Sequence, residues 1–421
     1  MPGDAGAAPA GGAATPIGLI GLQRIEAAAR AGHGVVRETP VLSSQTLSER
    51  AGTTVVLKAE NLQRTGSFKL RGALAKIASL GAQTAAGVVC GSAGNHAQAV
   101  AYAARSLGVG CEVFMPEAAP ITKVEAAEAL GATVHLTGVN VDEALTAALA
   151  RAQEAGMVFI HPFDDPDVVA GQGSLGLELL RQVPEMGRVV VPVGGGGLLS
   201  GVAIAIKSMR PDVQLVGIQV EACATFPASL QAGEPRAVPS ARTIADGIAV
   251  KRPGKLTLAL IEEWADQILV VSEDEVAEAM VFLLERSKLV VEGAGAVGVA
   301  ALLSGRLSTP VGGTTVLVLS GGNVDAGLLA EVARRHETQS GRRLVTQLLI
   351  PDRPGSLAGL LGLIGEAGAN IVDVQHLREG LDLHVRETAV QLVMETRGPE
   401  HTALVRSRLR DAGYDEVSWG R

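Results

Sequence analysis

Aromatic side chains are scarce in this 421-residue chain, at 2% of all residues, and charged side chains make up only 19%. Hydrophobic residues nevertheless make up 47%, which is typical of a globular protein and argues against disorder. Because rings are so few, alanine, valine, leucine and glycine must fill the interior. The length exceeds that of one compact unit, so we expect two or three domains.

Cysteine is also rare: Cys90, Cys111 and Cys223 are far apart and show neither a CxxC spacing nor a Cys/His metal-binding spacing. This pattern excludes a disulfide scaffold and fits a reducing compartment, so we expect a cytoplasmic protein without a metal site. The formal net charge is -8 and no basic run is present, which argues against a nucleic-acid surface. Acidic and polar residues interrupt the basic cluster at residues 334–343, which indicates a solvated connector.

No membrane anchor is expected. Residues 1–16 lack the basic start and apolar core of a signal peptide, and their Ala/Gly/Pro composition predicts a disordered leader. The stretch from Val189 to Ile206 carries no charge and is nominally long enough to span a bilayer. Pro192 and the run of glycines from Gly194 to Gly197 favour a strand, a loop and a helix instead. The same reasoning applies to residues 307–324.

Apolar runs alternate with helical patterns through most of the chain. Fully apolar strands separated by helices predict an α/β fold with parallel sheets covered on both faces, which bind ligands at the carboxyl ends of their strands. The pattern changes near residue 335, where the order of predicted elements becomes β-α-β-β-α-β, a ferredoxin-like unit. Expected strands of the first part are at residues 88–92, 111–116, 133–138, 157–163, 188–193 and 213–221, and expected helices at 95–107, 122–130 and 142–154.

The four glycines Gly194, Gly195, Gly196 and Gly197 directly follow a predicted strand and precede a helix that begins near Leu198. Converging backbone N–H groups and the helix dipole make such a loop a site for an anion such as phosphate. The string is neither GxGxxG nor a P-loop, although Glu221 leaves a nucleotide site as a weak competitor. A tight turn without a ligand is the other alternative.

Lys69 stands in the string TGSFKLRGA, among small and apolar residues. A buried lysine has a lowered pKa, which makes its amine a usable nucleophile and base. An amine together with a phosphate loop suggests pyridoxal phosphate, which needs both.

Six strings appear in order: ENLQRTGSFKLRGA, SAGNHAQAVA, HPFDDPDVVAGQGSLGLE, VGGGGLLSG, TIADGIAV and VLSGGN. Together they resemble the threonine dehydratases (threonine ammonia-lyases), fold-type II pyridoxal-phosphate enzymes with a two-lobed, tryptophan-synthase-β-like catalytic unit. The tail with DRPGSL is similar to an ACT regulatory domain. The resemblance implies a catalytic domain at residues 17–335, with a small lobe at roughly 60–165 inserted in it, and an ACT domain at residues 344–421.

The resemblance also assigns roles to individual residues. Lys69 would bind the cofactor covalently and act as general base, Phe68 would pack beside its ring, and Asn95 would bond its ring oxygen. Residues 194–198 would hold the phosphate, and Ser320 would face the pyridine nitrogen. The loop formed by Ser92, Ala93, Gly94, Asn95 and His96 would receive the substrate carboxylate, although a structural role for His96 is the stronger alternative.

The resemblance implies that L-threonine is converted to 2-ketobutyrate and ammonia, and L-serine to pyruvate. The similar serine racemases often carry a serine at the position of Ala93, and alanine has no proton to exchange there, so dehydration is favoured over racemisation. A metal-binding aspartate of such relatives is replaced by Pro227, so Glu221 is interpreted as structural. A serine dehydratase, a serine racemase and a non-catalytic amino-acid sensor remain alternatives.

The expected regulatory domain has its own candidate site. Asp352, Gly355, Ser356, Leu357 and Asn370 would bind an effector, for which isoleucine or valine is the hypothesis. This rests on an analogy with isoleucine biosynthesis; threonine catabolism is the other role considered. Family likeness implies a homotetramer.

Overall fold

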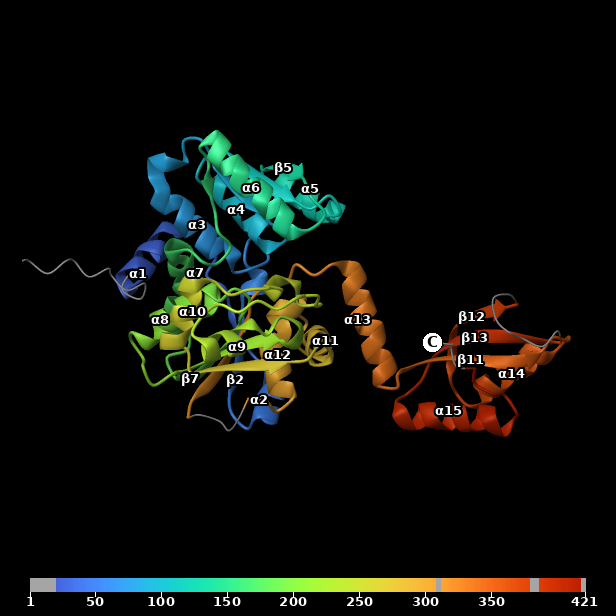
Figure 1. Cartoon of the computed structure of the whole chain (residues 1–421). Helices are drawn as coiled ribbons and strands as arrows, with labels where there is room; N and C mark the ends of the chain where they lie inside the picture. The colour runs from blue at the N-terminus through green and yellow to red at the C-terminus, as the bar shows by residue number, and fades with distance from the viewer. Residues whose placement is uncertain (1–19, 308–311, 379–385, 418–421) are drawn as a thin grey trace, which may run out of the picture. The chain divides into compact units, whose positions relative to one another are not determined.

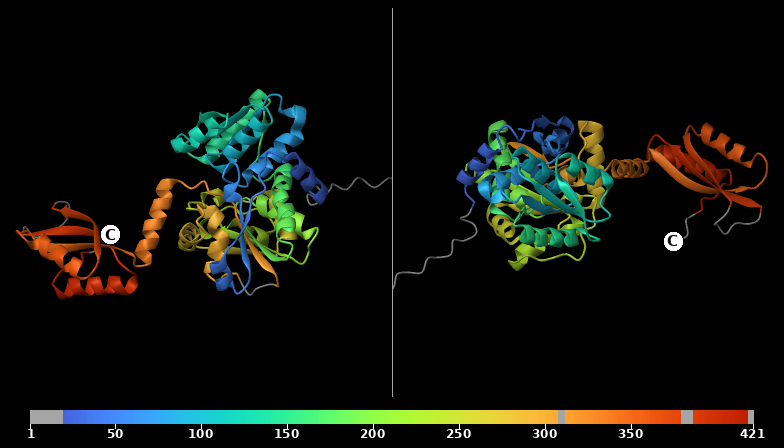
Figure 2. Two further views of the ribbon diagram at one scale, coloured as in Figure 1. Left: turned by 180° about the vertical axis from the view of Figure 1, so that it is seen from behind. Right: turned by 90° about the horizontal axis from the view of Figure 1, so that it is seen from above.

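The computed structural model describes residues 20–307, 312–378 and 386–417. The chain divides into two compact units, Met1–Val324 and Asp325–Arg421. The leader predicted at residues 1–16 lies outside the described residues. Figures 1 and 2 show the elements of each unit.

The larger sheet of the first unit has six strands in the order β1-β2-β10-β7-β8-β9. All neighbouring pairs are parallel except β1 and β2, which are antiparallel. Most of its central strands are buried, as the apolar runs predicted. The strands are β1 (Val41–Ser43), β2 (Val55–Ala59), β7 (Met186–Pro192), β8 (Gln214–Val220), β9 (Gln267–Val271) and β10 (Thr314–Leu319).

The smaller sheet of the first unit is wholly parallel, in the order β5-β4-β3-β6. Its strands are β3 (Val88–Gly91), β4 (Cys111–Met115), β5 (Thr133–Leu136) and β6 (Val158–Phe159). Together with α4 (Asn95–Ser106), α5 (Ile121–Ala129) and α6 (Val141–Ala155) it forms a separate lobe, drawn in cyan and green in Figure 1. The two parallel sheets confirm the predicted fold class.

Helices cover both sheets of the first unit. They are α1 (Leu22–Ala31), α2 (Gln45–Ala51), α3 (Lys69–Leu80), α4 (Asn95–Ser106), α5 (Ile121–Ala129), α6 (Val141–Ala155), α7 (Pro166–Gln182), α8 (Gly197–Lys207), α9 (Thr225–Ala232), α10 (Lys255–Trp264), α11 (Glu273–Phe282) and α12 (Gly293–Leu303). The uncharged stretch at residues 189–206 divides between β7 and α8, as predicted. No helix in the described part of the chain is both long and apolar enough to cross a membrane.

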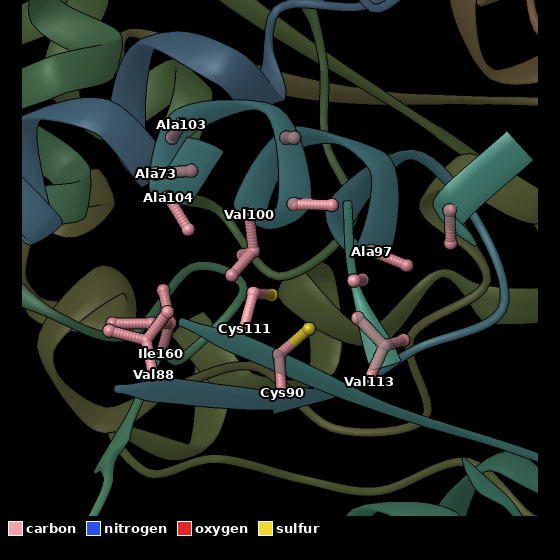
Figure 3. Close-up of a cluster of buried hydrophobic side chains, with 14 of the residues drawn as sticks. Ala73, Val88, Cys90, Ala97, Val100, Ala103, Ala104, Cys111, Val113 and Ile160 are labelled. Carbon is pink, nitrogen blue, oxygen red and sulfur yellow. The ribbon is translucent and has the colours of Figure 1, made fainter. Parts of the chain in front are cut away.

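The interior of the small lobe is built from small side chains, because the chain has few rings to offer. Alanines of α4 interleave with valines and cysteines of β3 and β4 in one buried cluster, shown in Figure 3. The three cysteines of the chain are free and buried, and burial raises the pKa of each thiol. Cys90 and Cys111 therefore serve as small apolar side chains of this cluster.

The second unit contains a three-stranded antiparallel sheet in the order β11-β13-β12. An isolated bridge between Leu348 and Glu416 adds a short fourth segment beside β11, in agreement with the β-α-β-β-α-β pattern. The basic cluster expected in a connector falls partly in the end of α13 and partly in β11. The elements are α13 (Ala326–Gln339), β11 (Arg343–Pro351), α14 (Ser356–Glu366), β12 (Asn370–Leu377), β13 (Glu387–Glu395) and α15 (Pro399–Asp411).

Candidate active site

Lys69 is the first residue of α3, and its surroundings are built by a pairing between distant segments. Ser67 forms a bridge with Gly321, and the Phe68 N–H donates to the Ser320 carbonyl oxygen at 3.0 Å. This pairing brings the lysine beside the end of β10. The Lys69 Nζ donates to the Pro162 carbonyl oxygen at 2.9 Å and lies 5.2 Å from the centre of the Phe68 ring.

Burial lowers the pKa of Lys69 from 10.5 to about 8, against the opposing attraction of Glu292. A fraction of the amine is therefore neutral near physiological pH, and the neutral form is what a nucleophile or a general base requires.

The glycine loop joins β7 to α8 and lies at the helix N-terminus, as predicted. Gly196 has a φ of +95°, which favours glycine, and a side chain there would meet the Phe226 ring at 2.8 Å. Gly194 is equally confined, since an added Cβ would lie 2.9 Å from the Ile248 Cα. The Thr257 hydroxyl donates to the Gly195 carbonyl oxygen at 2.6 Å, which fixes the orientation of the loop. The neighbours thus require glycines, and the bare backbone amides suit an anion.

The loop at residues 161–165 lies against both the amine and the glycine loop. The Phe163 ring occupies the position that a Cβ on Gly195 would take, with its nearest atom 2.2 Å from that point. Asp164 accepts hydrogen bonds from the Lys255 and Thr257 N–H groups, both at 3.1 Å, at the start of α10. Sequence reasoning quoted this string only for its resemblance and assigned no site role to Phe163.

Residues 92–96 span the loop before α4 and the first two residues of that helix. The Gly94 N–H donates to the Ser92 hydroxyl at 3.2 Å, and Ala93 packs against the core of the small lobe. Asn95 is the first helical residue. The His96 ring is buried, its Nε2 lies 2.9 Å from the Ile160 carbonyl oxygen, and burial lowers its pKa to about 3. These contacts favour a structural role for this imidazole.

One small cavity gathers most of the residues predicted to bind a cofactor. It is lined by Phe68, Lys69, Pro162, Phe163, Gln172, Pro192, Gly194, Gly195, Gly196, Gly197, Leu198, Gly247, Ile248, Val250 and Ser320. Residues 92–96 are not part of this lining. The volume is about 30 Å³, because the Phe163 ring lies over the glycine loop. A larger cavity of about 790 Å³ between α1, α3 and α7 lies away from this amine and glycine loop.

The residues of the small cavity fit pyridoxal phosphate in chemistry. The glycine loop offers N–H groups to a phosphate, Lys69 offers an amine to an aldehyde, and Ser320 offers a hydroxyl to a ring nitrogen. The Gln172 Oε1 in the same lining is buried without a partner among the described residues, as expected where a polar ligand binds.

Glu292 is a residue of this region that sequence reasoning missed. It lies at the N-cap of α12, is 3% exposed, and accepts a 2.7 Å hydrogen bond from the Asn95 Nδ2. Burial raises its pKa from 4.5 to about 7, with a further contribution from Asp246. The sequence feature that could have identified it is its isolation, because it is the one charged residue between Leu289 and Gly305. Glu221, by contrast, is exposed at the end of β8.

The predicted effector residues lie in the second unit, at opposite ends of its sheet. Asp352 follows β11 where Pro351 pairs with Glu387, whereas Asn370 begins β12 beside Glu395. Asp352 is exposed and forms an ion pair with Arg378, with both N–O distances at 2.9 Å. Gly355 has a φ of +89° and precedes α14, whose first residues are Ser356 and Leu357. The Asn370 amide donates to the Glu395 carboxylate at 2.8 Å. No ligand is needed to explain these contacts.

A buried amine that shares one cavity with a glycine loop, in a fold of two mostly parallel sheets, fits the class of enzymes that use pyridoxal phosphate. The sequence family described as pyridoxal-phosphate-dependent enzymes matches residues 33–321. The L-threonine ammonia-lyase of Thermotoga maritima is 44% identical over 398 residues, which is 94% of this chain and 99% of that protein. The chain belongs to the pyridoxal-phosphate-dependent enzymes, and within them to the family of the L-threonine ammonia-lyases.

Solved structures agree. The T.th. threonine deaminase has a TM-score of 0.69 and 44% identity, and the match covers 72% of this chain and 99% of that chain. Maize serine racemase has a TM-score of 0.71 and 33% identity, and the match covers 76% of this chain and 99% of that one.

Proposed function

We propose that this chain uses pyridoxal phosphate to convert L-threonine to 2-ketobutyrate and ammonia, and L-serine to pyruvate and ammonia. The observation that carries the proposal is the Lys69 amine, with its lowered pKa, in one cavity with the glycine loop and Ser320. Membership of the L-threonine ammonia-lyase family supports the same substrate.

When bound, pyridoxal phosphate supplies an electron sink for the bonds at the α-carbon of the amino acid. Lys69 and residues 194–198 would hold it. The Lys69 amine, freed when the amino group of the substrate takes its place on the cofactor, would take the α-proton at its Nζ, and burial lowers the pKa of this amine to about 8. Loss of the β-hydroxyl as water and hydrolysis of the released enamine give the 2-keto acid and ammonia.

Two further residues favour elimination. Ser320 is a neutral hydroxyl, so it does not hold the ring nitrogen protonated as a carboxylate would, and a long-lived carbanion is less favoured. Ala93 has no proton to deliver to the other face of the substrate. Racemisation through position 93 therefore has no chemical basis here, although the likeness to maize serine racemase makes D-serine a product that an assay must measure.

The test is a visible spectrum of the full chain with pyridoxal phosphate, followed by threonine addition and detection of 2-ketobutyrate. The wild type is expected to show a band of bound cofactor that changes with threonine. Lys69→Ala is expected to lose the band and to reduce turnover by about 100-fold or more, because it removes both the attachment point and the base.

Lys207→Ala is the matched control, since Lys207 lies at the end of α8 farthest from the glycine loop and pairs with Asp266 at 2.8 Å. It is expected to keep the spectrum and the turnover. Turnover retained by Lys69→Ala would contradict the role of that lysine and revive the alternative of a non-catalytic sensor. D-serine formed from L-serine as fast as pyruvate would favour the racemase.

The second unit is proposed to be an ACT regulatory domain that binds isoleucine or valine at the start of α14, where backbone N–H groups meet the effector carboxylate. Its antiparallel sheet with two helices supports this assignment. We propose a catalytic domain that ends at the division after Val324, short of the border expected at residue 335, and a regulatory domain that contains residues 344–421. We also propose a homotetramer and a cytoplasmic location. Isoleucine biosynthesis and threonine catabolism are both compatible roles.

A further inference from the structure

Glu292 is buried beside the proposed cofactor site. The donor and acceptor atoms of the neighbouring amide side chains can be assigned by starting from a backbone carbonyl group. The Asn323 Nδ2 donates to the Thr65 carbonyl oxygen at 2.8 Å. A backbone carbonyl can only accept, so the atom of Asn323 that faces it must be the NH₂ group. This assignment leaves no freedom to exchange the amide atoms of Asn323.

The same NH₂ group also determines the orientation of Asn95. It donates to the Asn95 Oδ1 at 2.7 Å, which must therefore be the carbonyl oxygen of that amide. The Asn95 Nδ2 consequently faces Glu292 and donates to its Oε1 at 2.7 Å. Three side chains thus form one ordered chain of donors and acceptors that ends at a carboxyl group.

Two glycines give Glu292 the room to reach Asn95. A Cβ on Gly321 would lie 2.3 Å from the Glu292 Oε1, and a Cβ on Gly247 would lie 3.0 Å from it. The Glu292 N–H also donates to the Gly321 carbonyl oxygen at 3.1 Å. The string TIADGIAV therefore provides space for this carboxyl group through Gly247. The string VLSGGN provides space through Gly321 and, through Asn323, one end of the hydrogen-bond chain.

We propose that Glu292 is a positioning residue: it accepts one N–H of the Asn95 amide and so directs the second N–H at the ring oxygen of bound pyridoxal phosphate. The inference rests on the proposed function, since it presupposes the cofactor. A carboxyl group accepts through Oε1 whether it is charged or protonated, so this role persists on both sides of the pKa of about 7.

The acceptor and the charge can be separated by two substitutions. Glu292→Gln keeps an oxygen that accepts from Asn95 and loses the charge, whereas Glu292→Met keeps the length and loses the acceptor. For the full chain, Glu292→Met is expected to weaken pyridoxal phosphate binding about tenfold or more, because it leaves a buried donor without a partner. Its bound-cofactor absorbance should also shift. Glu292→Gln should restore both properties.

Glu278→Met is the control, because Glu278 is exposed on the neighbouring α11. If Glu292→Met does not fold, Asn323→Leu provides a second test, because it removes the other end of the hydrogen-bond chain at a partly exposed position. It should likewise weaken the binding of pyridoxal phosphate. Wild-type affinity and spectrum in Glu292→Met and Asn323→Leu would overturn the inference, as would equal weakening by Glu292→Gln and Glu292→Met. Failure of the proposed function is distinct, because the wild type itself would then not bind pyridoxal phosphate or form 2-ketobutyrate.

Discussion

The amine of Lys69 lies where its charged form is costly, and this has a consequence for the cofactor-free protein. Its pKa falls from 10.5 to about 8 in the folded chain, so between these values the unfolded chain binds more protons than the folded chain. The free energy of unfolding therefore rises with pH through this window. The full cost of burying the charged amine is present below pH 8. At about 1.4 kcal/mol per pKa unit, that cost is about 3 kcal/mol at neutral pH.

Lys69→Met is accordingly expected to stabilise the cofactor-free protein at pH 7, by about 2 kcal/mol after the lost hydrogen bond to Pro162 is counted. The measurement is denaturant unfolding of both proteins without cofactor at pH 7 and at pH 9.5. The advantage of the variant should shrink at the higher pH, because the wild-type amine is then mostly neutral. An advantage that is absent at pH 7, or that grows with pH, would contradict the assigned environment.

The sequence predicted some site residues and missed others for a physical reason. Lys69 and the glycine run carry their signal locally, as an unusual amine among small residues and as four consecutive flexible residues. Glu292 meets Asn95 across 197 positions of the chain, and Asn323 meets it across 228. Such contacts depend on how the sheets pack, and no pattern within one segment of a single sequence encodes them.

At the level of elements, a buried ionic network joins β2, α3 and α7. Arg71 donates to Glu60 at 2.8 and 2.9 Å and to Glu178 at 2.7 Å. Lys58 donates to the other oxygen of Glu178 at 2.6 Å. Burial alone would raise the pKa of Glu60, but Arg71 outweighs it and holds that pKa below its ordinary value. The network therefore fixes α3, and Lys69 at its start, against the large sheet.

Arg71→Met is expected to destabilise the chain by about 3–5 kcal/mol, because it leaves the buried Glu60 carboxylate without its ion-pair partner and Glu178 with Lys58 alone. The control is Arg181→Met, which breaks an exposed pair with Glu38 and should cost less than about 1 kcal/mol. Equilibrium unfolding of the two variants side by side is the measurement. Equal losses would mean that the network is better solvated than its burial implies.

The elements themselves were predicted where one pattern dominates. Buried strands such as β7 and β8 are mostly apolar, and their positions agree with the prediction to within two residues. The stretch at residues 334–343 was interpreted as a connector because its residues are mostly polar or charged. The structure places an amphipathic helix, α13, before the strand β11, and only one residue of that helix, Val332, is buried. A helix that buries so little leaves a weak apolar pattern in the sequence.

For the whole molecule, the division at Val324 sets the natural point for a truncation. The T.th. threonine deaminase is matched over 99% of its length by only 72% of this chain, so a catalytic unit without the second unit has a counterpart among solved structures. A cut near Arg335 would leave most of α13 without the unit to which it belongs. A chain that ends at Val324 is therefore the cleaner variant.

The chain that ends at Val324 is expected to deaminate threonine without any response to isoleucine or valine, because the proposed effector residues are absent. In the full chain, one of these amino acids should change the threonine concentration for half-maximal rate by about fivefold or more, which is typical of coupling between two sites. Rates measured across threonine concentrations, with and without each effector and with glycine as the control amino acid, test this. If neither chain responds, the second unit does not sense branched-chain amino acids. If the shorter chain keeps the response, the effector site lies in the catalytic unit instead.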